Sequence, residues 1–487
     1  MLLAILLIPC AAAVASLVGP ARRAPAVTLA AAIACLGLVI ALVPAAAHGT
    51  PAAASYLRAD AVSVIFLLAT AFLYAVVAVY AVGYVPAEHE ADDRYARRFH
   101  ALFNLFAASM LAAPLMSSLA LLWIAVEVTT VVSALLVALE DTDSAAEAAW
   151  KYVMIASAGL GLALLATIFL YYAGAQVLGE HFNLAITSLI ATGPRLPHAP
   201  VLLAFMLATL GYGTKAGLFP AHTWLPDAHS EAATPVSALL SGALLATSFY
   251  AITRFYQVAA ATLGSGIPRD ALLAFGVCSL LLASLYVLGQ RDVKRLLAYS
   301  SIEHMGILAI GVSFGSPVAL AGVLLHVIAH AAAKGSAFMG AGVFRIKYRA
   351  KEVPAMRGGL EILPWSGPLF LMAVFALSAL PPSGIFRSEF QIVAGGLASG
   401  QHAAAAVLVA GVTVAFFGLT TSATRMLMTR PARSLGAAAV VERGEPSAWL
   451  VVPMVACVAV LAVLGVHPPG ELSDLITRGA AQLGGRP

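Results

Sequence analysis

The chain has 487 residues, of which 61% are hydrophobic and only 10% are charged. Soluble domains carry about 25% charged residues, so this composition excludes an ordinary soluble protein. The mean hydropathy of +0.93 points the same way. The formal net charge is only +4, which gives no support for nucleic-acid binding.

Apolar runs of membrane-spanning length recur along the whole chain and are continuous, whereas the strands of a β-barrel would alternate polar and apolar residues. The sequence therefore predicts an all-α polytopic membrane protein with about fourteen transmembrane helices. The predicted spans are residues 1–19, 26–47, 60–84, 99–115, 117–139, 151–172, 200–221, 235–257, 270–289, 296–314, 317–344, 366–397, 403–424 and 448–467.

The first run resembles a secretory signal peptide, but it lacks a positively charged start, and the basic pair Arg22 and Arg23 follows the run. We therefore expect it to remain as the first span, with its start outside. Most of the 27 Lys and Arg then fall on the inner side, as the positive-inside rule requires. The prediction is a bacterial or archaeal cytoplasmic membrane protein with both termini outside.

The four cysteines are isolated within apolar runs, without the spacing of metal ligands or of a CxxC motif. The stretch GYGTKAG, residues 211–217, has glycine and lysine but not the order of a phosphate-binding loop. We therefore predict no cofactor and no metal in this chain. Any Ni–Fe centre, iron–sulfur cluster or flavin would belong to partner subunits.

Two predicted spans are interrupted by helix-breaking residues, the seventh by glycines before Pro220 and the twelfth by Pro381 and Pro382. If spans four to eight and nine to thirteen are two five-helix repeats, each break takes the fourth place, and an odd repeat length makes the repeats inverted. The expected single membrane domain, 1–487, comprises 1–98 with three spans, 99–257 as the first half-channel repeat, 270–424 as the second, and 448–487 as the last span and tail.

Ionisable residues lie within or beside these spans: Glu127 in the middle of span five, Lys215 at the first break, and Arg387 and Glu389 at the second. A charge in hydrocarbon is costly, so we expect Glu127 and Lys215 to pair at about 4 Å, which gains roughly 4 kcal/mol at an effective dielectric near 20. A static pair that fixes helix packing is the alternative. Intramembrane ionisable residues usually mark ion paths, which favours a proton path.

The stretch LLHVIAHAAAKG places His326, His330 and Lys334 four residues apart. On a helix they form a stripe about 12 Å long on one face, which suits a polar lining and not a lipid contact. Histidines bonded to backbone carbonyls are the alternative for each residue alone. Together with the lysine, the stripe favours a proton relay, with one water bridging each step of about 6 Å. Two histidines four apart on one helix cannot take opposite axial positions on one haem iron, although each could bind an iron together with a ligand elsewhere.

FPAHTWLPDAHSEAATPVSALLSG at residues 219–242 and LLAYSSIEHMG at 296–306 resemble the antiporter-like proton-channel subunits of respiratory complex I, membrane-bound hydrogenases and Mrp cation/proton antiporters. EAAWKY, SIEHMG and LLHVIAHAAAKG look most like component F of hydrogenase-4. By this resemblance, Glu127 and Lys215 act in the first half, three residues of span eleven form a central relay, and Glu389 is the exit-side residue. The implied proton pathway is Glu127, Lys215, His326, His330, Lys334 and Glu389.

The chain departs from complex I relatives at Ala246, where many carry a second lysine. The link from Lys215 to span eleven must then use water, with Thr247, Ser248 or His222 as candidate helpers. The predicted function is a proton-translocating membrane subunit that works with other membrane subunits and a peripheral redox module. An Mrp-type Na⁺/H⁺ antiporter subunit, the proton subunit of an inorganic-carbon transporter, and a membrane anchor with a relict polar axis are the rival predictions.

Overall fold

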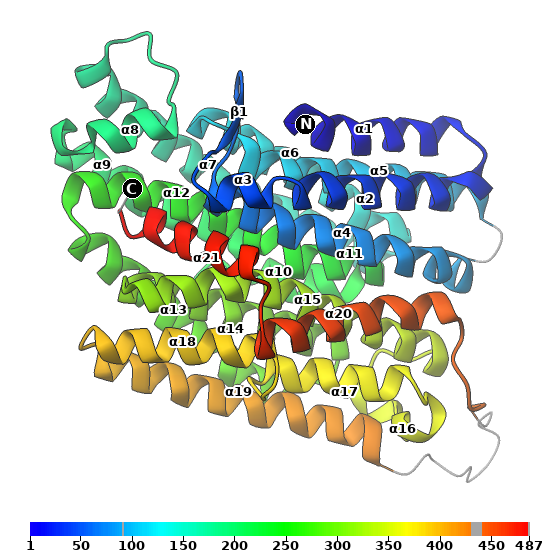
Figure 1. Cartoon of the computed structure of the whole chain (residues 1–487). Coiled ribbons are helices and arrows are strands. Elements are labelled where there is room, and N and C mark those ends of the chain that lie inside the picture. Colours follow the sequence, from blue (N-terminus) through cyan, green and yellow to red (C-terminus); the bar gives the residue numbers. More distant parts are fainter. Residues whose placement is uncertain (90–91, 430–440, 486–487) are drawn as a thin grey trace.

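The computed structural model describes residues 1–89, 92–429 and 441–485. Long helices run roughly side by side through the whole molecule (Figure 1). Eleven of them are long and apolar enough to cross a membrane, and the apolar helices Leu2–Val18 and Ser366–Leu377 are shorter. The predicted all-α membrane architecture is confirmed, while the count of about fourteen spans and the inversion of the repeats stay predictions.

The N-terminal part and the first predicted repeat contain long helices near the expected spans, together with short helices at residues 186–192 and 224–231, which lie between predicted spans. They are α1 (Leu2–Val18), α2 (Ala24–Ile40), α3 (Val43–Ala47), α4 (Ala61–Glu88), α5 (Asp93–Ala112), α6 (Leu119–Val137), α7 (Asp143–Leu178), α8 (Ile186–Thr192), α9 (His198–Ala216), α10 (Trp224–Glu231), α11 (Thr234–Leu239) and α12 (Leu245–Leu263). A small antiparallel hairpin, β1 (Ala52–Ala54) with β2 (Leu57–Ala59), lies between α3 and α4.

The second predicted repeat and the C-terminal part continue the bundle. Their helices are α13 (Gly266–Val287), α14 (Val293–Phe314), α15 (Pro317–Tyr348), α16 (Gly359–Ile362), α17 (Ser366–Leu377), α18 (Gly384–Ala398), α19 (His402–Met428), α20 (Ala448–Val466) and α21 (Gly470–Leu483). Residues 486–487 of the expected tail lie outside the described residues.

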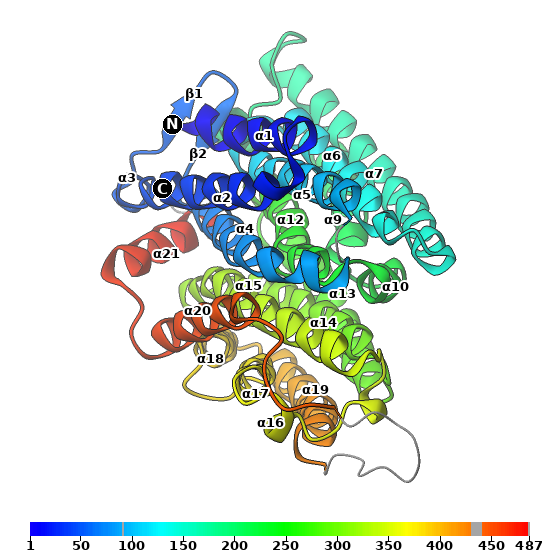
Figure 2. The same cartoon turned by 90° about the vertical axis from the view of Figure 1, so that its right-hand side faces the viewer.

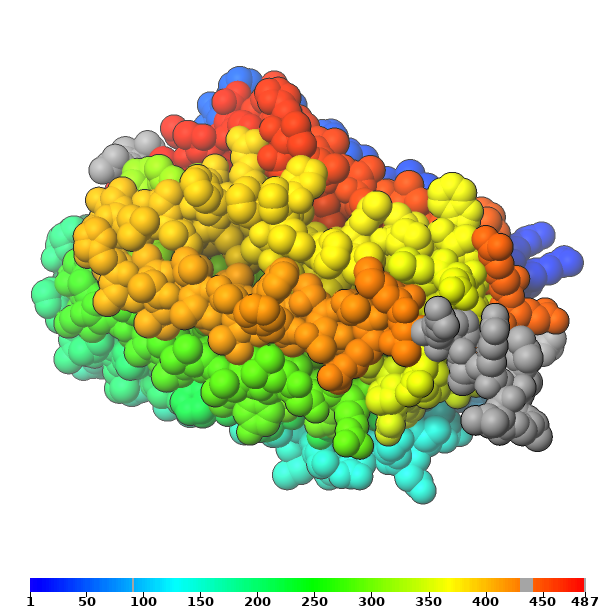
Figure 3. All heavy atoms as spheres, turned by 90° about the horizontal axis from the view of Figure 1, so that it is seen from below, coloured from blue at the N-terminus to red at the C-terminus, as the bar shows by residue number. Residues whose placement is uncertain are grey.

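The centre of the bundle is formed by α4, α12, α14 and α15, whose side chains are almost all buried. Figure 2 shows α15 between the N-terminal helices and the group formed by α17 to α20. Helices α18 and α19 lie in the middle of the face seen from below in Figure 3. Because α14 and α15 face protein on all sides, the titratable residues in their middle turns lie inside the molecule and away from lipid.

Small residues let some neighbouring helices approach closely. A Cβ added at Gly211 on α9 would lie 2.6 Å from the Gly159 carbonyl oxygen on α7. Gly276 on α13 and Gly306 on α14 meet in the same way, each with its Cβ position 2.8 Å from the carbonyl oxygen of the other. These two glycine contacts join α7 to α9 in the first predicted repeat and α13 to α14 in the second.

The break in the seventh predicted span begins where α9 ends at Ala216. Gly217 takes the left-handed conformation, with φ of 81°, that glycine adopts without steric cost. The N–H groups of Gly217 and Leu218 donate hydrogen bonds to carbonyl oxygens in the last turn of α9. The indole Nε1 of Trp224 donates to the Thr214 carbonyl at 2.8 Å. These bonds satisfy the helix end within the protein, as a break at membrane depth requires, and they fix Lys215 in the last turn of α9.

The second break separates α17 from α18. Ser383 precedes α18, and its hydroxyl oxygen accepts from the Phe386 N–H at 3.2 Å, an N-terminal cap. Arg387 points away from the bundle axis: its guanidinium donates to the carbonyls of Gly465 and Val466 at 3.4 and 3.3 Å, at the C-terminal end of α20. Glu389, two residues later, is buried.

The eighth predicted span has a π-helical segment, Leu240–Leu244, between α11 and α12. A π turn accommodates one residue more than the α-helix and often occurs at functional sites. Ser241 lies in this segment, and its hydroxyl shares a 2.7 Å hydrogen bond with that of Ser301 on α14. The segment therefore joins the first predicted repeat to the second through a polar contact.

The start of α1 and the end of α21 lie towards the end of the bundle that carries β1 and β2 (Figures 1 and 2). At this end Arg254 on α12 donates to Asp60, the residue that precedes α4, at 2.5 Å. Arg254 also donates to Gln257, whose amide donates to the Gln482 carbonyl on α21 at 3.0 Å. This network connects α4, α12 and α21, which are far apart in the sequence.

Candidate functional site

Lys215 is fully buried, as expected for an intramembrane lysine, but its contacts differ from the prediction. Among the ion pairs of 4.0 Å or less in residues 1–89, 92–429 and 441–485, none joins Lys215 to Glu127. Lys215 Nζ instead donates to the Val126 carbonyl at 3.1 Å and to the Thr130 hydroxyl. The predicted 4 Å pair is therefore wrong, because Glu127 is half-buried on α6 while the backbone and a hydroxyl of that same helix satisfy the lysine.

Glu127 still lies on the same helix as the two acceptors of Lys215, one residue after Val126. Within the described part of the chain, its Oε2 is buried without a hydrogen-bond partner. On the other side of Lys215, the Tyr152 ring lies 5.9 Å from Nζ, within reach of a cation–π contact. Glu127 and Lys215 are thus near neighbours in one polar region, separated by a gap that a water or a side-chain movement could bridge.

The two histidines of the predicted stripe lie on one face of α15, with their ring centres 6.1 Å apart. Both are fully buried. A third histidine, His304 on α14, lies beside both of them, with ring-centre distances of 5.1 and 5.2 Å. The predicted spacing of about 6 Å is thus found, and an imidazole from a neighbouring helix, which the sequence did not predict, joins the two.

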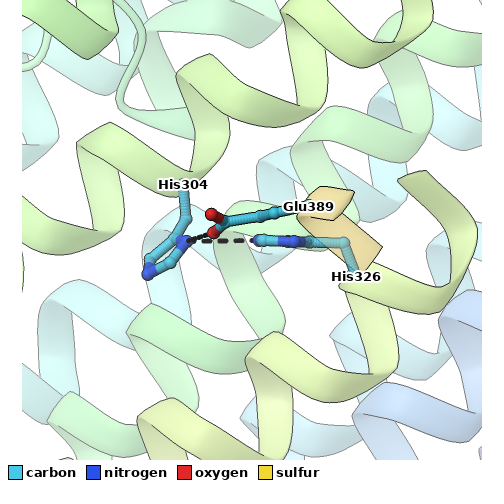
Figure 4. Close-up of side chains that lie close together, drawn as sticks. All are labelled: His304, His326 and Glu389. Carbon is cyan, nitrogen blue, oxygen red and sulfur yellow. Dashed lines mark hydrogen bonds and ion pairs between the residues drawn. The ribbon is translucent and has the colours of Figure 1, made fainter. Parts of the chain in front are cut away.

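His304 connects the stripe to Glu389, as Figure 4 shows. His304 Nδ1 lies 3.2 Å from His326 Nε2 and 3.7 Å from Glu389 Oε1. All three side chains are buried, although they come from the separate helices α14, α15 and α18. The fold therefore brings Glu389 and His326 to one nitrogen atom of His304.

The hydrogen bonds of Ser388 define which nitrogen of His326 carries the proton. The Ser388 hydroxyl donates to the Ile385 carbonyl at 2.7 Å, so its oxygen accepts from His326 Nδ1–H at 2.9 Å. In the neutral ring, His326 Nε2 then presents its lone pair to His304. This arrangement leaves His326 ready to accept a proton on the side that faces His304 and Glu389.

Lys334, the third member of the stripe, is bonded to α14. Its Nζ donates to the Leu297 carbonyl and to the Ser300 hydroxyl, both at 2.9 Å. The Leu297 carbonyl also accepts from the Ser301 hydroxyl at 3.0 Å, and Ser301 contacts Ser241 in the π-helical segment. A line of hydrogen-bonding groups thus runs from Lys334 back towards the first predicted repeat.

Four further buried titratable residues lie on α14 or on α10, which packs against it, and were not predicted as site residues. Glu303 and His304 stand side by side on α14, Lys294 lies at the start of that helix, and His229 lies on α10. Lys294 Nζ donates to the Ala232 carbonyl at 2.5 Å and to the Ser237 hydroxyl at 3.3 Å. The ring of His229 stacks on Phe338, one turn beyond Lys334, with centres 5.2 Å apart.

The sequence held a usable signal for two of them. Glu303 and His304 are adjacent ionisable residues inside a predicted span, a pattern that by itself marks a functional position. Lys294 lies before the predicted start of the tenth span at residue 296, and His229 lies between two predicted spans, so both counted as loop residues. Their burial follows from the packing of α10 against α14, which hydropathy does not encode.

The three candidate helpers for the central link differ in what they offer. The hydroxyls of Thr247 and Ser248 donate to carbonyls one turn earlier in their own helix, at 2.9 and 3.1 Å. Their oxygens keep lone pairs for another donor. His222 is buried at the first break, and its Nδ1 has no partner among the described residues. The structure supplies polar groups for the link and leaves the route between Lys215 and Ser241 to be bridged by water.

Residues 116–418 match the family described as "NADH:quinone oxidoreductase/Mrp antiporter, TM". The hydrogenase-4 component F homolog of Methylacidiphilum infernorum is 34% identical over 363 residues, which are 74% of this chain and 76% of that protein. A chain of the Mrp complex from Dietzia sp. DQ12-45-1b superimposes with a TM-score of 0.86 at 20% identity, covering 99% of this chain and 97% of the other. A chain of respiratory complex I from Thermus thermophilus gives 0.83 at 22% identity, covering 99% and 100%.

A multi-pass helical bundle with two broken spans and a buried line of lysines, histidines and carboxylates defines the class of antiporter-like membrane subunits. The chain belongs to the NADH:quinone oxidoreductase/Mrp antiporter transmembrane family. The component F homolog aligns with it over about three quarters of both lengths, at 34% identity.

Proposed function

We propose that the chain is a proton-translocating membrane subunit of a multisubunit oxidoreductase of the hydrogenase-4 or complex I type. The observation that carries the proposal is the buried series His326, His304 and Glu389, whose successive polar atoms lie 3.2 and 3.7 Å apart. Such ionisable residues are costly inside a membrane protein and usually mark ion paths.

In the second predicted repeat, the proton passes from His326 to Glu389 through His304. A proton on His326 Nε2 passes to the Nδ1 lone pair of neutral His304, and from there to the ionised Glu389 carboxylate, which faces the same atom. The His326 ring keeps its other proton bonded to Ser388 throughout. An imidazole suits this role because both of its protonation states are accessible near neutral pH.

In the first half, Lys215 is the proton carrier and Glu127 the group that controls it. The carbonyl and hydroxyl acceptors of Lys215 hold it whether or not Glu127 is charged, and an ionised Glu127 nearby favours the ammonium form. A change in the position or the protonation of Glu127 then changes how readily Lys215 releases a proton. Redox chemistry in partner subunits would drive that change, and any Ni–Fe centre, iron–sulfur cluster or flavin would be held there.

Lys334, Ser300, Ser301 and Ser241 carry the proton between the halves, together with water. In this proposal both termini lie outside the cytoplasmic membrane. An Mrp-type antiporter subunit and a carbon-uptake subunit would use the same axis with a different partner. Identification of the subunits that co-purify with the chain from its native membrane distinguishes them, because the oxidoreductase requires a peripheral module with redox centres.

Proton pumping in inverted membrane vesicles of the native host tests the pathway. We expect His304→Ala to slow the initial rate of acidification about tenfold or more at equal expression, since positioned proton-transfer groups contribute about 10² to 10⁴-fold to rates. Ser313→Ala is the matched control, because Ser313 is buried on the same helix and donates only to the Ile310 carbonyl. Wild-type pumping by His304→Ala would refute the proposed second half.

A further inference from the structure

The three groups that meet in Figure 4 have the composition of a transition-metal site. His304, His326 and Glu389 each offer one ligand atom, and these three atoms all lie within 4.8 Å of one another. We propose that they bind a divalent transition metal ion, with Zn²⁺ as the best fit, and that the bound ion stops proton transfer through the second half.

The distances suit one ion at tetrahedral geometry. Zn²⁺ binds histidine nitrogen and carboxylate oxygen at about 2.0 to 2.2 Å, so two ligand atoms on one tetrahedral ion lie about 3.3 to 3.6 Å apart. The observed separations are 3.2 Å between the two histidine nitrogens and 3.7 Å between His304 Nδ1 and Glu389 Oε1. All three ligand atoms lie within 4.8 Å of one another, so the third pair, on His326 and Glu389, must close by at most about 1 Å for one ion to bind all three, with water in the fourth position.

The hydrogen bonds around the three groups already favour a metal-binding form. Ser388 accepts the Nδ1–H of His326 and so directs its Nε2 lone pair towards the other ligands, as second-sphere partners of metal-bound histidines do. His304 Nε2 has no partner in the described part of the chain, so the ring can hold its single proton there and present Nδ1 to the ion. Glu389 Oε1 is likewise buried without a hydrogen bond among the described residues.

The ligand set also sets the selectivity. Two imidazoles and one carboxylate suit Zn²⁺ and its transition-metal neighbours, whereas Mg²⁺, Ca²⁺ and Na⁺ prefer oxygen ligands. The buried Glu303 carboxylate adjoins His304 and helps Glu389 to balance the charge of a divalent ion. Lys334, one turn after His330 on α15, opposes it and limits the affinity.

A cavity of about 400 Å³ lies at the start of α15 and is lined by Gln391 on α18, the helix of Glu389. Arg269 and Gly315 also line this cavity, at the end of the bundle where β1 and β2 lie. Residues two apart on a helix point to nearly opposite sides, and Glu389 itself does not line the cavity.

The effect on transport follows from the atoms involved. A metal bound to His304 Nδ1, His326 Nε2 and Glu389 occupies the lone pairs that would carry the proton, so the series is blocked at all three groups. This consequence rests on the proposed function. The metal site itself does not, since it depends only on the geometry of the three ligands.

Binding is tested first on the purified protein, in its native complex or in detergent, with Zn²⁺ as the probe. We expect one tight Zn²⁺ per chain, and an X-ray absorption spectrum of the wild type with two imidazoles and a light-atom ligand. Glu389→Gln and His304→Ala should weaken that site at least about 100-fold, and Ser388→Ala about 10 to 100-fold. His402→Gln is the control, because His402 is exposed at the start of α19 and should not change the tight site.

Absence of a tight site in the wild type, a spectrum without two imidazoles, or equal affinity in all variants would overturn the metal site. The wild-type spectrum needs no variant to fold, so misfolding of a variant does not decide the question. The inhibitory role is tested separately, by Zn²⁺ titration of proton pumping in vesicles. Inhibition should track occupancy of the tight site and should persist in His402→Gln. Tight binding that leaves pumping unchanged would overturn the block, and normal pumping by metal-free His304→Ala would instead refute the relay.

Discussion

Three buried lysines are held by the same kind of hydrogen-bond acceptors. Lys215, Lys334 and Lys294 each donate to a backbone carbonyl and to a hydroxyl, and no carboxylate lies within ion-pair distance of any of them among the described residues. Two acceptors match two of the three N–H bonds of an ammonium, so one proton is left without a protein partner. This arrangement suits groups that must release a proton, because a close carboxylate would hold it.

The hydroxyl partner of Lys215 should therefore matter to transport. We expect Thr130→Val to slow proton pumping about tenfold, since a hydrogen bond to a charged group contributes about 1.5 to 3 kcal/mol. Thr167→Val is the control: Thr167 is buried on the neighbouring helix α7, and its hydroxyl donates to the Ala163 carbonyl at 2.9 Å, which is not an acceptor of Lys215.

Initial pumping rates in inverted vesicles, at equal amounts of the protein, measure the effect. Combination of Thr130→Val with Lys215→Ala should be no worse than Lys215→Ala alone, because both changes act on the same group. Additive losses in the double variant would mean that Thr130 acts independently of the lysine.

The comparison with the sequence is clearest at this scale. Burial of Glu389, Lys215, His326, His330 and Lys334 was predictable, because ionisable residues in apolar spans must avoid lipid. The contact of His304 with Glu389 was not predictable, since hydropathy does not fix the rotation of α14 against α15 and α18. The rotation of one helix against another also explains why Glu127 does not pair with Lys215. The lysine contacts α6 at the carbonyl of Val126, one residue before the Glu127 carboxylate.

At the scale of elements, glycine contacts set the distances between helices that carry the site. Lys215 lies on α9, one turn beyond Gly211, and His304 lies on α14, two residues before Gly306. The expected helix bounds were close to those observed because apolar runs and breaking residues determine them locally. The close approaches depend on pairs of residues far apart in the chain, which no single span reveals.

Substitution of Gly211 by alanine should separate α7 from α9. Its Cβ would lie 2.6 Å from the Gly159 carbonyl oxygen and 2.7 Å from the Ala163 nitrogen, both of the backbone, so neither can turn aside. We expect a loss of about 1 to 3 kcal/mol in the free energy of unfolding, the usual cost of overpacking.

Gly161→Ala on α7 is the control, because a Cβ there meets no atom within 4 Å. Thermal unfolding in detergent compares the stability of the two variants. Proton pumping should be measured on the same variants, because Lys215 would move with α9. Equal thermal midpoints for both variants would show that the two helices are not held at this contact.

At the scale of the whole molecule, the buried polar residues from Lys215 to Glu389 stay aligned only if the two predicted repeats and the N- and C-terminal parts keep fixed positions relative to one another. The contacts of Arg254 with Asp60 and Gln257 and the bond of Gln257 to α21 join three distant segments at one end of the bundle. The sequence predicted a single membrane domain, but not which loop and tail residues would meet there.

The Arg254 and Asp60 pair should make stability depend on acid pH. Burial alone would raise the pKa of the Asp60 carboxyl, but the charge and hydrogen bond of Arg254 outweigh burial and hold the pKa below its ordinary value. A lowered folded-state pKa means that the contribution of the pair is complete above about pH 4 and is lost as the pH falls through the lowered value.

Arg254→Met should cost about 3 kcal/mol in the free energy of unfolding at pH 7, because Asp60 stays behind unpaired. Arg269→Met is the control in the same cavity wall, since Arg269 makes only long bonds of 3.4 Å to Tyr256 and Gly315. Thermal midpoints from pH 3 to pH 7 measure both effects. A variant that lost the same stability at every pH would show that packing and not the ion pair supplies it.

The π-helical segment amounts to a one-residue insertion that a later deletion could remove. Deletion would restore an unbroken α-helix, but it would rotate everything after the segment by about 100° relative to everything before it. Ser241 could then face Ser301, or Arg254 could face Asp60, but not both. The additional residue therefore sets the angle between the two parts of the helix. It lets Ser241 face Ser301 in the middle of the bundle while Arg254 faces Asp60 at the end of the bundle.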